Sequence, residues 1–186
     1  MKIIAIGAST GGTEALHTVL SALPADVPPI LIVQHMPRNF TEAFARRLDQ
    51  TTALKVSEAV GGETPQRGCA YLAPGHLHLL LRRRAAGFVL ELSADPPVSH
   101  HRPSADALFF SVAEAAGPEA IGVILTGMGK DGAKGLLAMR EKGAWTIGQD
   151  EQSCVVYGMP RAAFELGALS EVAPLAEIAA RIAARS

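Results

Sequence analysis

Cysteine is scarce in this sequence, and that scarcity limits what can hold the fold together. Only two cysteines, Cys69 and Cys154, occur among 186 residues. Two are too few for a disulfide framework, and their wide spacing matches no zinc motif. The simplest interpretation is a cytoplasmic protein with reduced thiols, in which each cysteine is a small buried hydrophobe.

An excess of charge of one sign and long apolar runs are also lacking. The 17 basic side chains nearly balance the 18 acidic ones, which leaves no general attraction for nucleic acid or an anionic membrane. No apolar run approaches the roughly 18 residues that span a bilayer, and residues 1–7 are too short for the core of a signal peptide. The sequence therefore predicts no nucleic-acid partner, no membrane insertion and no export.

Short runs rich in Ile, Val and Leu are what the sequence does contain. They lie at residues 2–6, 30–33 and 121–125, and residues 144–148 are a further strand candidate. Runs without polar alternation predict strands buried on both faces, as in a parallel sheet. Helices are predicted between and after them, at residues 13–23, 41–49, 106–116, 134–142, 160–166 and 174–184. This alternation predicts an α/β fold, a doubly wound and mostly parallel sheet flanked by helices.

The segment 55–93 has a different composition from the rest of the chain. Glycines and prolines separate short apolar runs at residues 70–73, 77–81 and 88–92. The pattern predicts antiparallel hairpins that elaborate the main sheet. Before this segment, Phe40 precedes the helix predicted at 41–49 and is expected to fasten it to the core.

Polar side chains follow three of the buried runs, at the sheet edge where parallel sheets bind ligands. They are Ser9, His35 and Asp131. A serine hydroxyl needs a base within reach, a histidine can take its proton near neutral pH, and a carboxylate can orient the imidazole. Residues 7–11, Gly-Ala-Ser-Thr-Gly, also match G-x-S-x-G, a tight strand-to-helix turn that exposes its serine. The set predicts a serine hydrolase.

Each part of this set has another interpretation when it is taken alone. The glycine-rich turn at 7–12 could bind a phosphate or nucleotide, although it matches neither the P-loop nor G-x-G-x-x-G. His35 alone could be structural, and Asp131 could be a turn former. The histidine pairs at 76/78 and 100/101 lack a further ligand at suitable spacing, so no metal and no cofactor are predicted.

Five segments together resemble the catalytic domain of the CheB family, the chemotaxis protein-glutamate methylesterases. They are residues 7–13 (Gly-Ala-Ser-Thr-Gly-Gly-Thr), 34–37 (Gln-His-Met-Pro), 101–104 (His-Arg-Pro-Ser), 125–133 (Leu-Thr-Gly-Met-Gly-Lys-Asp-Gly-Ala) and 158–160 (Gly-Met-Pro). The resemblance runs from residue 3 to about residue 172. It implies a cytoplasmic serine hydrolase that demethylates glutamate methyl esters on chemoreceptor signalling helices. Many members of the family also deamidate receptor glutamines.

The resemblance also implies roles for particular residues. Ser9 matches the family's nucleophile, His35 its base and Asp131 its orienting acid. Met128 matches the position whose backbone N–H helps to form the oxyanion hole. The N–H of Thr10 is a second candidate donor, from the usual geometry of a nucleophile turn.

Three further residues are candidates for contact with the substrate. Arg38 follows His35 closely, and the resemblance places His101 and Arg102 in a loop close to the active site. An arginine at position 38 could reach acidic residues on a receptor helix.

Full-length members of the family carry an N-terminal phosphorylatable receiver domain. Here the first strand follows residue 1 at once, so we expect one catalytic domain over residues 1–186 and no receiver domain in this chain. Regulation would then come from a separate domain or protein. The alternatives from other classes are a nucleotide- or phosphate-binding module that uses residues 7–12, and a catalytically inactive domain that only docks on receptors.

Overall fold

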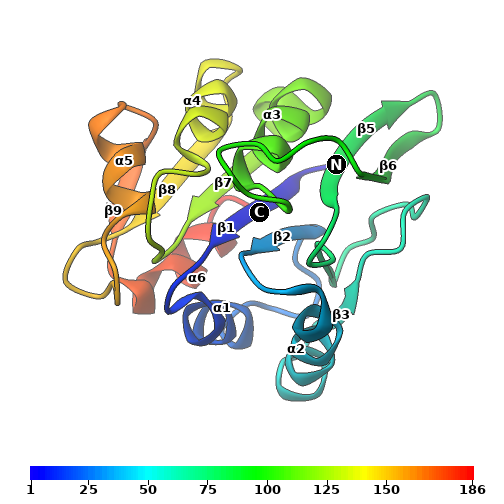
Figure 1. Ribbon diagram of the computed structural model, residues 1–186, viewed down its shortest axis with the longest axis horizontal. Coiled ribbons are helices and arrows are strands. Elements are labelled where there is room, and N and C mark those ends of the chain that lie inside the picture. The colour runs from blue at the N-terminus through cyan, green and yellow to red at the C-terminus, as the bar shows by residue number, and fades with distance from the viewer.

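A seven-stranded sheet forms the middle layer of the structure, and all of its paired strands are parallel. The computed structural model describes residues 1–186. The strand order is β3-β4-β2-β1-β7-β8-β9 (Figure 1). The strands are β1 (Ile3–Ala8), β2 (Ile30–Gln34), β3 (Lys55–Glu58), β4 (Cys69–Leu72), β7 (Ala120–Ile124), β8 (Trp145–Gln149) and β9 (Glu171–Ala173). Every residue of β1, β2 and β7 is buried, which explains why these runs lack polar alternation.

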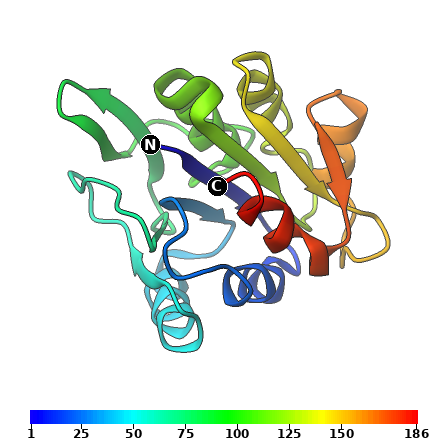
Figure 2. The same ribbon diagram turned by 180° about the vertical axis from the view of Figure 1, so that it is seen from behind.

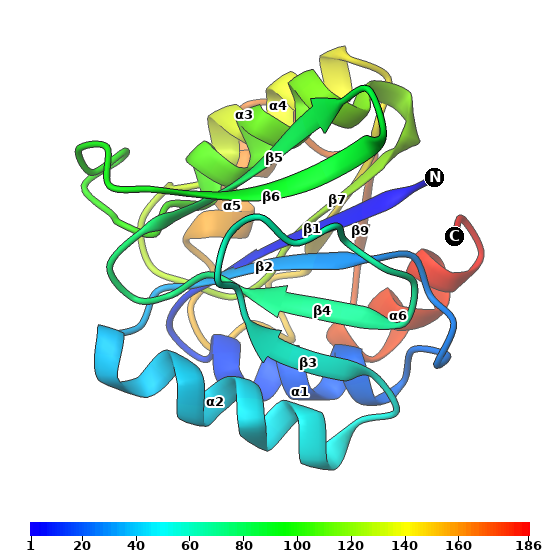
Figure 3. The ribbon, with the colours of Figure 1, turned by 90° about the vertical axis from the view of Figure 1, so that its right-hand side faces the viewer.

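Helices cover both faces of this sheet (Figure 3). One face is covered by α1 (Gly12–Ser21), α2 (Arg38–Thr51) and α6 (Leu175–Ala183). The other is covered by α3 (Ala105–Ala116), α4 (Ala133–Glu141) and α5 (Met159–Glu165), and a 3-10 turn, Gly117–Glu119, follows α3. This arrangement confirms the predicted doubly wound α/β fold.

The strand alternation divides the apolar side chains between two cores. Ile3 and Ala5 of β1 pack with α3, whereas Ile4 and Ile6 pack with α1 on the opposite face. Phe109 of α3 is fully buried against the sheet, and a Cβ on Gly7 would lie 3.2 Å from its ring. The first helix after β1 leads to β2 on one side, while β7 flanks β1 on the other. The carboxyl end of β1 is therefore the switch point of the sheet, where such folds bind ligands.

The segment 55–93 forms fewer hairpins than the sequence predicts. Only β5 (His78–Arg84) and β6 (Gly87–Ser93) pair antiparallel, and they form a separate two-stranded sheet (Figure 3). The prediction for residues 70–73 was wrong, because β4 pairs parallel with β2 and β3 in the main sheet. Ala70, Tyr71 and Leu72 are buried, which is the property of a central parallel strand. The nearby glycines and prolines belong to its connections and do not make it a hairpin.

The expected role of Phe40 was also wrong. Helix α2 begins at Arg38, and Phe40 lies in its first turn with 59% of its surface exposed. The buried residue of this turn is Thr41, whose hydroxyl donates to Arg38 O and accepts from Gly75 N–H. A polar side chain therefore fastens the start of α2.

The two ends of the chain lie near each other at the amino end of β1 (Figure 2), where Lys2 Nζ donates to the carbonyl of Arg185. None of the helices combines the length and the apolar character needed to cross a bilayer.

The close approach of α3 and α4 gives a first prediction, for Gly135→Ala. A Cβ at Gly135 would lie 2.7 Å from Phe109 Cβ and 2.8 Å from Asp106 O, so the helices must separate. Overpacking costs about 1–3 kcal/mol, which outweighs the gain of about 1 kcal/mol in helix propensity. We expect a lower midpoint in urea unfolding. Lys134→Ala, an exposed change on the same turn, is the control and should leave the midpoint nearly unchanged; a stabilised Gly135→Ala would contradict the prediction.

Candidate active site

Ser9 lies in the short turn between β1 and α1. The turn passes through Gly11 in the left-handed conformation, with φ of 79°, where a side chain is also excluded because a Cβ would lie 2.6 Å from Val155. The Ser9 N–H donates to Thr126 O at 3.0 Å, which fastens the turn to the segment after β7. The Ser9 hydroxyl is half-buried and makes no hydrogen bond within the protein.

His35 lies at the matching position of the neighbouring strand. Ala8 of β1 pairs with Gln34 of β2, so Ser9 and His35 follow at adjacent register positions, roughly 4.8 Å apart in a parallel sheet. By strand alternation both side chains leave the sheet on the face that α3 covers. The buried Gln34 links them further, because its Nε2 donates to Ser9 O at 2.9 Å and to His35 O at 3.2 Å.

Asp131 meets His35 at the start of α3. Its Oδ2 accepts from His35 Nε2 at 2.7 Å, and its side chain is fully buried. Three more groups at the N-terminus of α3 donate hydrogen bonds to the Asp131 carboxylate: Ser104 Oγ at 2.7 Å, Ala105 N–H at 2.8 Å and Asp106 N–H at 3.0 Å. A carboxylate is favoured here because the first N–H groups of a helix have no partner inside it.

These contacts keep Asp131 ionised. Burial alone would raise the pKa of its carboxyl, but the hydrogen bonds from His35, Asp106 N–H, Ser104 and Ala105 N–H outweigh burial and hold the pKa below its usual value of 3.8. The charge is therefore available to orient the imidazole and to stabilise an imidazolium.

The two nitrogens of His35 have different surroundings. Nε2 bonds Asp131, whereas Nδ1 is buried and has no hydrogen-bond partner. An imidazole that donates from Nε2 is protonated there, so Nδ1 carries the free lone pair. The arrangement leaves the lone pair of Nδ1 without a hydrogen-bond donor.

A second histidine, His78, supports the carboxylate of Asp131 through Ser104. His78 is buried at the start of β5, its Nε2 donates to Pro96 O at 3.1 Å, and its Nδ1 accepts from Ser104 N–H at 3.2 Å. Ser104 in turn caps α3 through Ala107 N–H and donates to Asp131. With both nitrogens occupied, His78 is a structural residue. No three His, Cys, Asp or Glu side chains are placed to share a metal ion.

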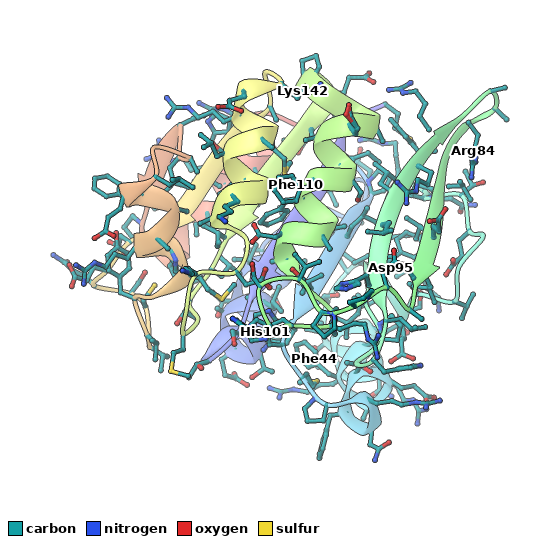
Figure 4. All side chains as sticks on the ribbon, turned by 45° about the horizontal axis from the view of Figure 1, so that its top comes forward. Phe44, Arg84, Asp95, His101, Phe110 and Lys142 are labelled. Carbon is teal, nitrogen blue, oxygen red and sulfur yellow. The ribbon has the colours of Figure 1, made fainter.

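An open groove of about 380 Å³ lies beside His35. It is lined by His35, Met36, Pro37, His100, His101, Arg102 and Pro103. His101 stacks on His35, with ring centroids 3.7 Å apart and planes 7° from parallel; Figure 4 shows it close to the start of α3.

The two candidate oxyanion donors both have free N–H groups. Neither Thr10 N–H nor Met128 N–H donates a hydrogen bond within the protein. The backbone around them is held by Thr126, whose hydroxyl donates to Thr10 O at 2.9 Å and accepts from Val156 N–H at 3.0 Å. Met128 is 70% exposed.

The arginines expected to contact substrate differ in their surroundings. Arg38 is exposed and its guanidinium has no ion pair or hydrogen bond in the protein. Arg102 donates to Ala94 O at 2.8 Å and to Asp95 O at 3.2 Å, so its guanidinium joins two parts of the loop between β6 and α3. A role in substrate contact stays a prediction for both, as the catalytic roles of Ser9, His35 and Asp131 do.

The thiol of Cys154, which lies near Thr126, is unreactive at neutral pH. Cys154 is half-buried near Thr126, and neither cysteine forms a disulfide. Burial raises the pKa of the Cys154 thiol to about 11, so it stays protonated at neutral pH.

Sequence reasoning missed the residues that hold the site together, chiefly Gln34, His78 and Ser104. Two of them had a usable signal. Gln34 is a polar residue at the end of a fully apolar strand, and Ser104 is a serine just before a predicted helix, a preferred capping position. His78 had none, because nothing local indicates that β5 lies against the loop before α3.

The low pKa of Asp131 gives a prediction for Asp131→Asn. The wild-type carboxylate contributes stability above its usual pKa of 3.8 and loses it as pH falls through its lower folded value. Asparagine lacks the charge at every pH. Its amide NH2 replaces one of the two carboxylate oxygens, so a donor faces either Ala105 N–H or Asp106 N–H, which donate to different oxygens of Asp131. We expect Asp131→Asn to be less stable by about 1–3 kcal/mol at pH 7, and this deficit to shrink toward pH 3.

Urea unfolding across this pH range measures the effect. Asp26→Asn is the control, because the Asp26 side chain is 87% exposed. Its difference from the wild type should be small at both ends of the range. A deficit of Asp131→Asn that stays constant with pH would contradict the prediction.

Comparison with known proteins gives this chain a family. A family model described as CheB methylesterase matches residues 4–182. A protein-glutamate methylesterase/protein-glutamine glutaminase of Dechloromonas aromatica is 62% identical over 181 residues, which are 97% of this chain and 52% of the relative. A relative of the same description from Nitrosomonas europaea is 59% identical over 99% of this chain and 51% of its own length. The chain thus spans about half the length of these curated relatives.

A solved structure agrees over the whole chain. The crystal structure of the Thermotoga maritima CheB methylesterase catalytic domain is 39% identical and superposes with a TM-score of 0.97, covering 100% of this chain and 98% of that one. The fold, the family model and the relatives agree: the chain belongs to the CheB methylesterase family.

Proposed function

We propose that this chain hydrolyses methyl esters of glutamate side chains on the signalling helices of chemoreceptors, with Ser9, His35 and Asp131 as its catalytic residues. The observation that carries the proposal is the 2.7 Å bond from His35 Nε2 to the buried Asp131, which leaves His35 Nδ1 without a partner. The membership of the CheB methylesterase family supports the choice of substrate.

In the first half of the reaction, Ser9 Oγ attacks the ester carbonyl carbon while His35 Nδ1 takes the hydroxyl proton. Asp131 stabilises the imidazolium that forms, through Nε2–H. The tetrahedral intermediate then breaks its bond to the methoxy oxygen, and His35 returns the proton to that oxygen. Methanol leaves, and the glutamyl group remains as an ester on Ser9.

In the second half, water attacks the ester on Ser9 and gives its proton to Nδ1. The bond to Ser9 Oγ breaks, and His35 returns that proton to the serine. The products are a glutamate side chain and methanol, and the enzyme is unchanged. In both halves the N–H groups of Met128 and Thr10 donate to the oxyanion, a role supported by their lack of other partners.

The same acyl-enzyme allows deamidation of glutamine. The relatives from Dechloromonas aromatica and Nitrosomonas europaea are described as both methylesterase and glutaminase. Only the leaving group differs, since ammonia replaces methanol in the first half. We include glutaminase activity in the proposal for this chain.

The proposed substrate also sets the partner and the location. Receptor signalling helices lie in the cytoplasm, so the reaction takes place there. Arg38, exposed beside the groove and without an ionic partner, is suited to contact an acidic residue on such a helix. No cofactor takes part in the steps above.

The role of the nucleophile predicts the outcome of Ser9→Ala. Without the hydroxyl no acyl-enzyme forms, so methanol release from methylated receptor should fall by about a thousandfold or more. The fold should persist, because the Ser9 side chain makes no hydrogen bond within the protein. Radiolabelled methanol release measures the rate, and circular dichroism checks the fold.

A fluorophosphonate probe separates this proposal from its alternatives. It should label Ser9 in the wild type and in the control Ser21→Ala, an exposed change at the end of α1, but not in Ser9→Ala. A phosphate-binding module or an inactive docking domain would not be labelled. Methanol release by Ser9→Ala near the wild-type rate would rule out the assignment.

The fold predicts how residues 1–186 respond to a phosphodonor. Seven of their nine strands form one parallel sheet and the other two form the β5–β6 hairpin, so these residues contain no second parallel sheet that could provide a receiver pocket. We expect the purified 186-residue chain to demethylate receptor without a partner, and acetyl phosphate to leave its rate unchanged. Strong stimulation by acetyl phosphate, or activity only after a partner is added, would contradict this prediction.

A further inference from the structure

The face of the His35 ring is covered by a second imidazole. The centroids of His35 and His101 are 3.7 Å apart and their planes are nearly parallel. We propose that His101 is a positioning residue: by stacking, it holds the His35 ring in the plane in which Nε2 bonds Asp131 and Nδ1 stays without a partner, free to accept a proton from Ser9. This inference rests on the proposed function, because it assigns His35 the role of base.

A single hydrogen bond does not fix the plane of a ring. The bond from His35 Nε2 to Asp131 restrains one atom, and Nδ1 at the other side has no partner. The ring could therefore tilt about its one bond and move Nδ1 away from the serine. A flat surface against one face removes that freedom, and small misplacements of a catalytic group cost large factors in rate.

His101 is itself held firmly enough to serve as such a surface. Its N–H donates to Val98 O at 2.9 Å and its carbonyl accepts from Val98 N–H at 3.0 Å, which closes a tight turn. The two residues inside the turn, Ser99 and His100, have φ of 50° and 66°, a conformation that side chains other than glycine seldom adopt. Such a turn persists only where its surroundings determine it.

The turn is also tied to two helices. Ser99 Oγ donates to Asp106 Oδ2 at 2.8 Å, and Asp106 Oδ1 accepts from Gly135 N–H at 2.7 Å. Asp106 is buried in the first turn of α3, and Gly135 belongs to α4. The stacked ring is thereby anchored to the same helix start that holds Asp131.

The charge state of His101 suits a neighbour of the base. Burial and the nearby His35 lower the pKa of His101, with a smaller opposing effect from Asp131 and a like-charge effect from His100. A neutral ring does not repel the imidazolium that His35 would become.

The rival role for His101 is direct contact with the receptor, and a small probe separates the two. A fluorophosphonate needs the Ser9–His35 pair but has no helix to be recognised. A positioning residue affects its labelling rate, whereas a residue that contacts only the receptor does not.

The test compares His101→Ala, which removes the ring, with His101→Phe, which keeps a flat ring without nitrogens. We expect Ser9 labelling in His101→Ala to be slower by about tenfold to a hundredfold. His101→Phe should stay within about threefold of the wild type, because stacking restores the plane. On methylated receptor the loss should appear in kcat rather than KM. His17→Ala, on α1 across the sheet, is the matched control and should label normally.

Three results would overturn the inference: normal labelling of His101→Ala with a raised KM for receptor, equal losses in His101→Ala and His101→Phe, or no loss in either. Should His101→Ala fail to fold, His101→Leu gives a side chain of similar bulk without a ring. In the NMR spectrum of the wild type, the stacked imidazole should shift the His35 ring protons upfield. Ring protons of His35 at ordinary chemical shifts would also contradict stacking. Failure of the proposed function is a different result, in which Ser9 labels normally but methylated receptor releases no methanol.

Discussion

The site depends on one buried carboxylate at the start of one helix. Removing Asp131 from water is costly, and the cost is met by four donors: His35 Nε2, Ser104 Oγ and the N–H groups of Ala105 and Asp106. The same contacts cap α3 and fix its position over β1. Because α3 and His35 both bond Asp131, the packing of α3 and the orientation of the His35 ring cannot change independently. A substitution that moves α3 is therefore expected to act on His35 as well.

The parallel sheet supplies the other constraint, the distance between serine and histidine. Since β1 and β2 are in register at Ala8 and Gln34, the residues that follow them lie side by side and on one face. Gln34 then joins the two turns through Ser9 O and His35 O. A glycine is required opposite this point, because a Cβ on Gly127 would lie 2.7 Å from Ser9 Cβ. The spacing of the pair is thus set by the backbone, whereas Met128 and His101 lie on loops.

Sequence reasoning predicted the parts of this arrangement that are local. Strands buried on both faces lack the alternation of polar and apolar residues, so the segments that form β1, β2, β7 and β8 predict a parallel sheet. The polar residues that follow these strands predict the edge of the sheet at which a ligand binds. Strand β9 was missed because it has three residues, only one of them buried. The run that became β4 was assigned to a hairpin because glycines and prolines surround it, and no local signal distinguishes a central strand with irregular connections from a hairpin strand. The support of Asp131 by His78 and the stacking of His101 on His35 depend on contacts between distant segments, which one sequence does not reveal.

The use of the two histidine nitrogens follows from where their partners come from. In the usual serine-hydrolase arrangement the carboxylate bonds Nδ1 and the serine meets Nε2, whereas here the carboxylate bonds Nε2. Ser9 follows the adjacent strand and has a short side chain, so in the proposed reaction it would meet the nitrogen nearer the backbone, Nδ1. Asp131 arrives from the loop after β7 and reaches the outer nitrogen. Nδ1 has no hydrogen-bond partner, so no bond to a backbone carbonyl fixes the ring through it, as happens in many histidines. The plane of the base must be set by a contact with its face, and in this structure that contact is the ring of His101.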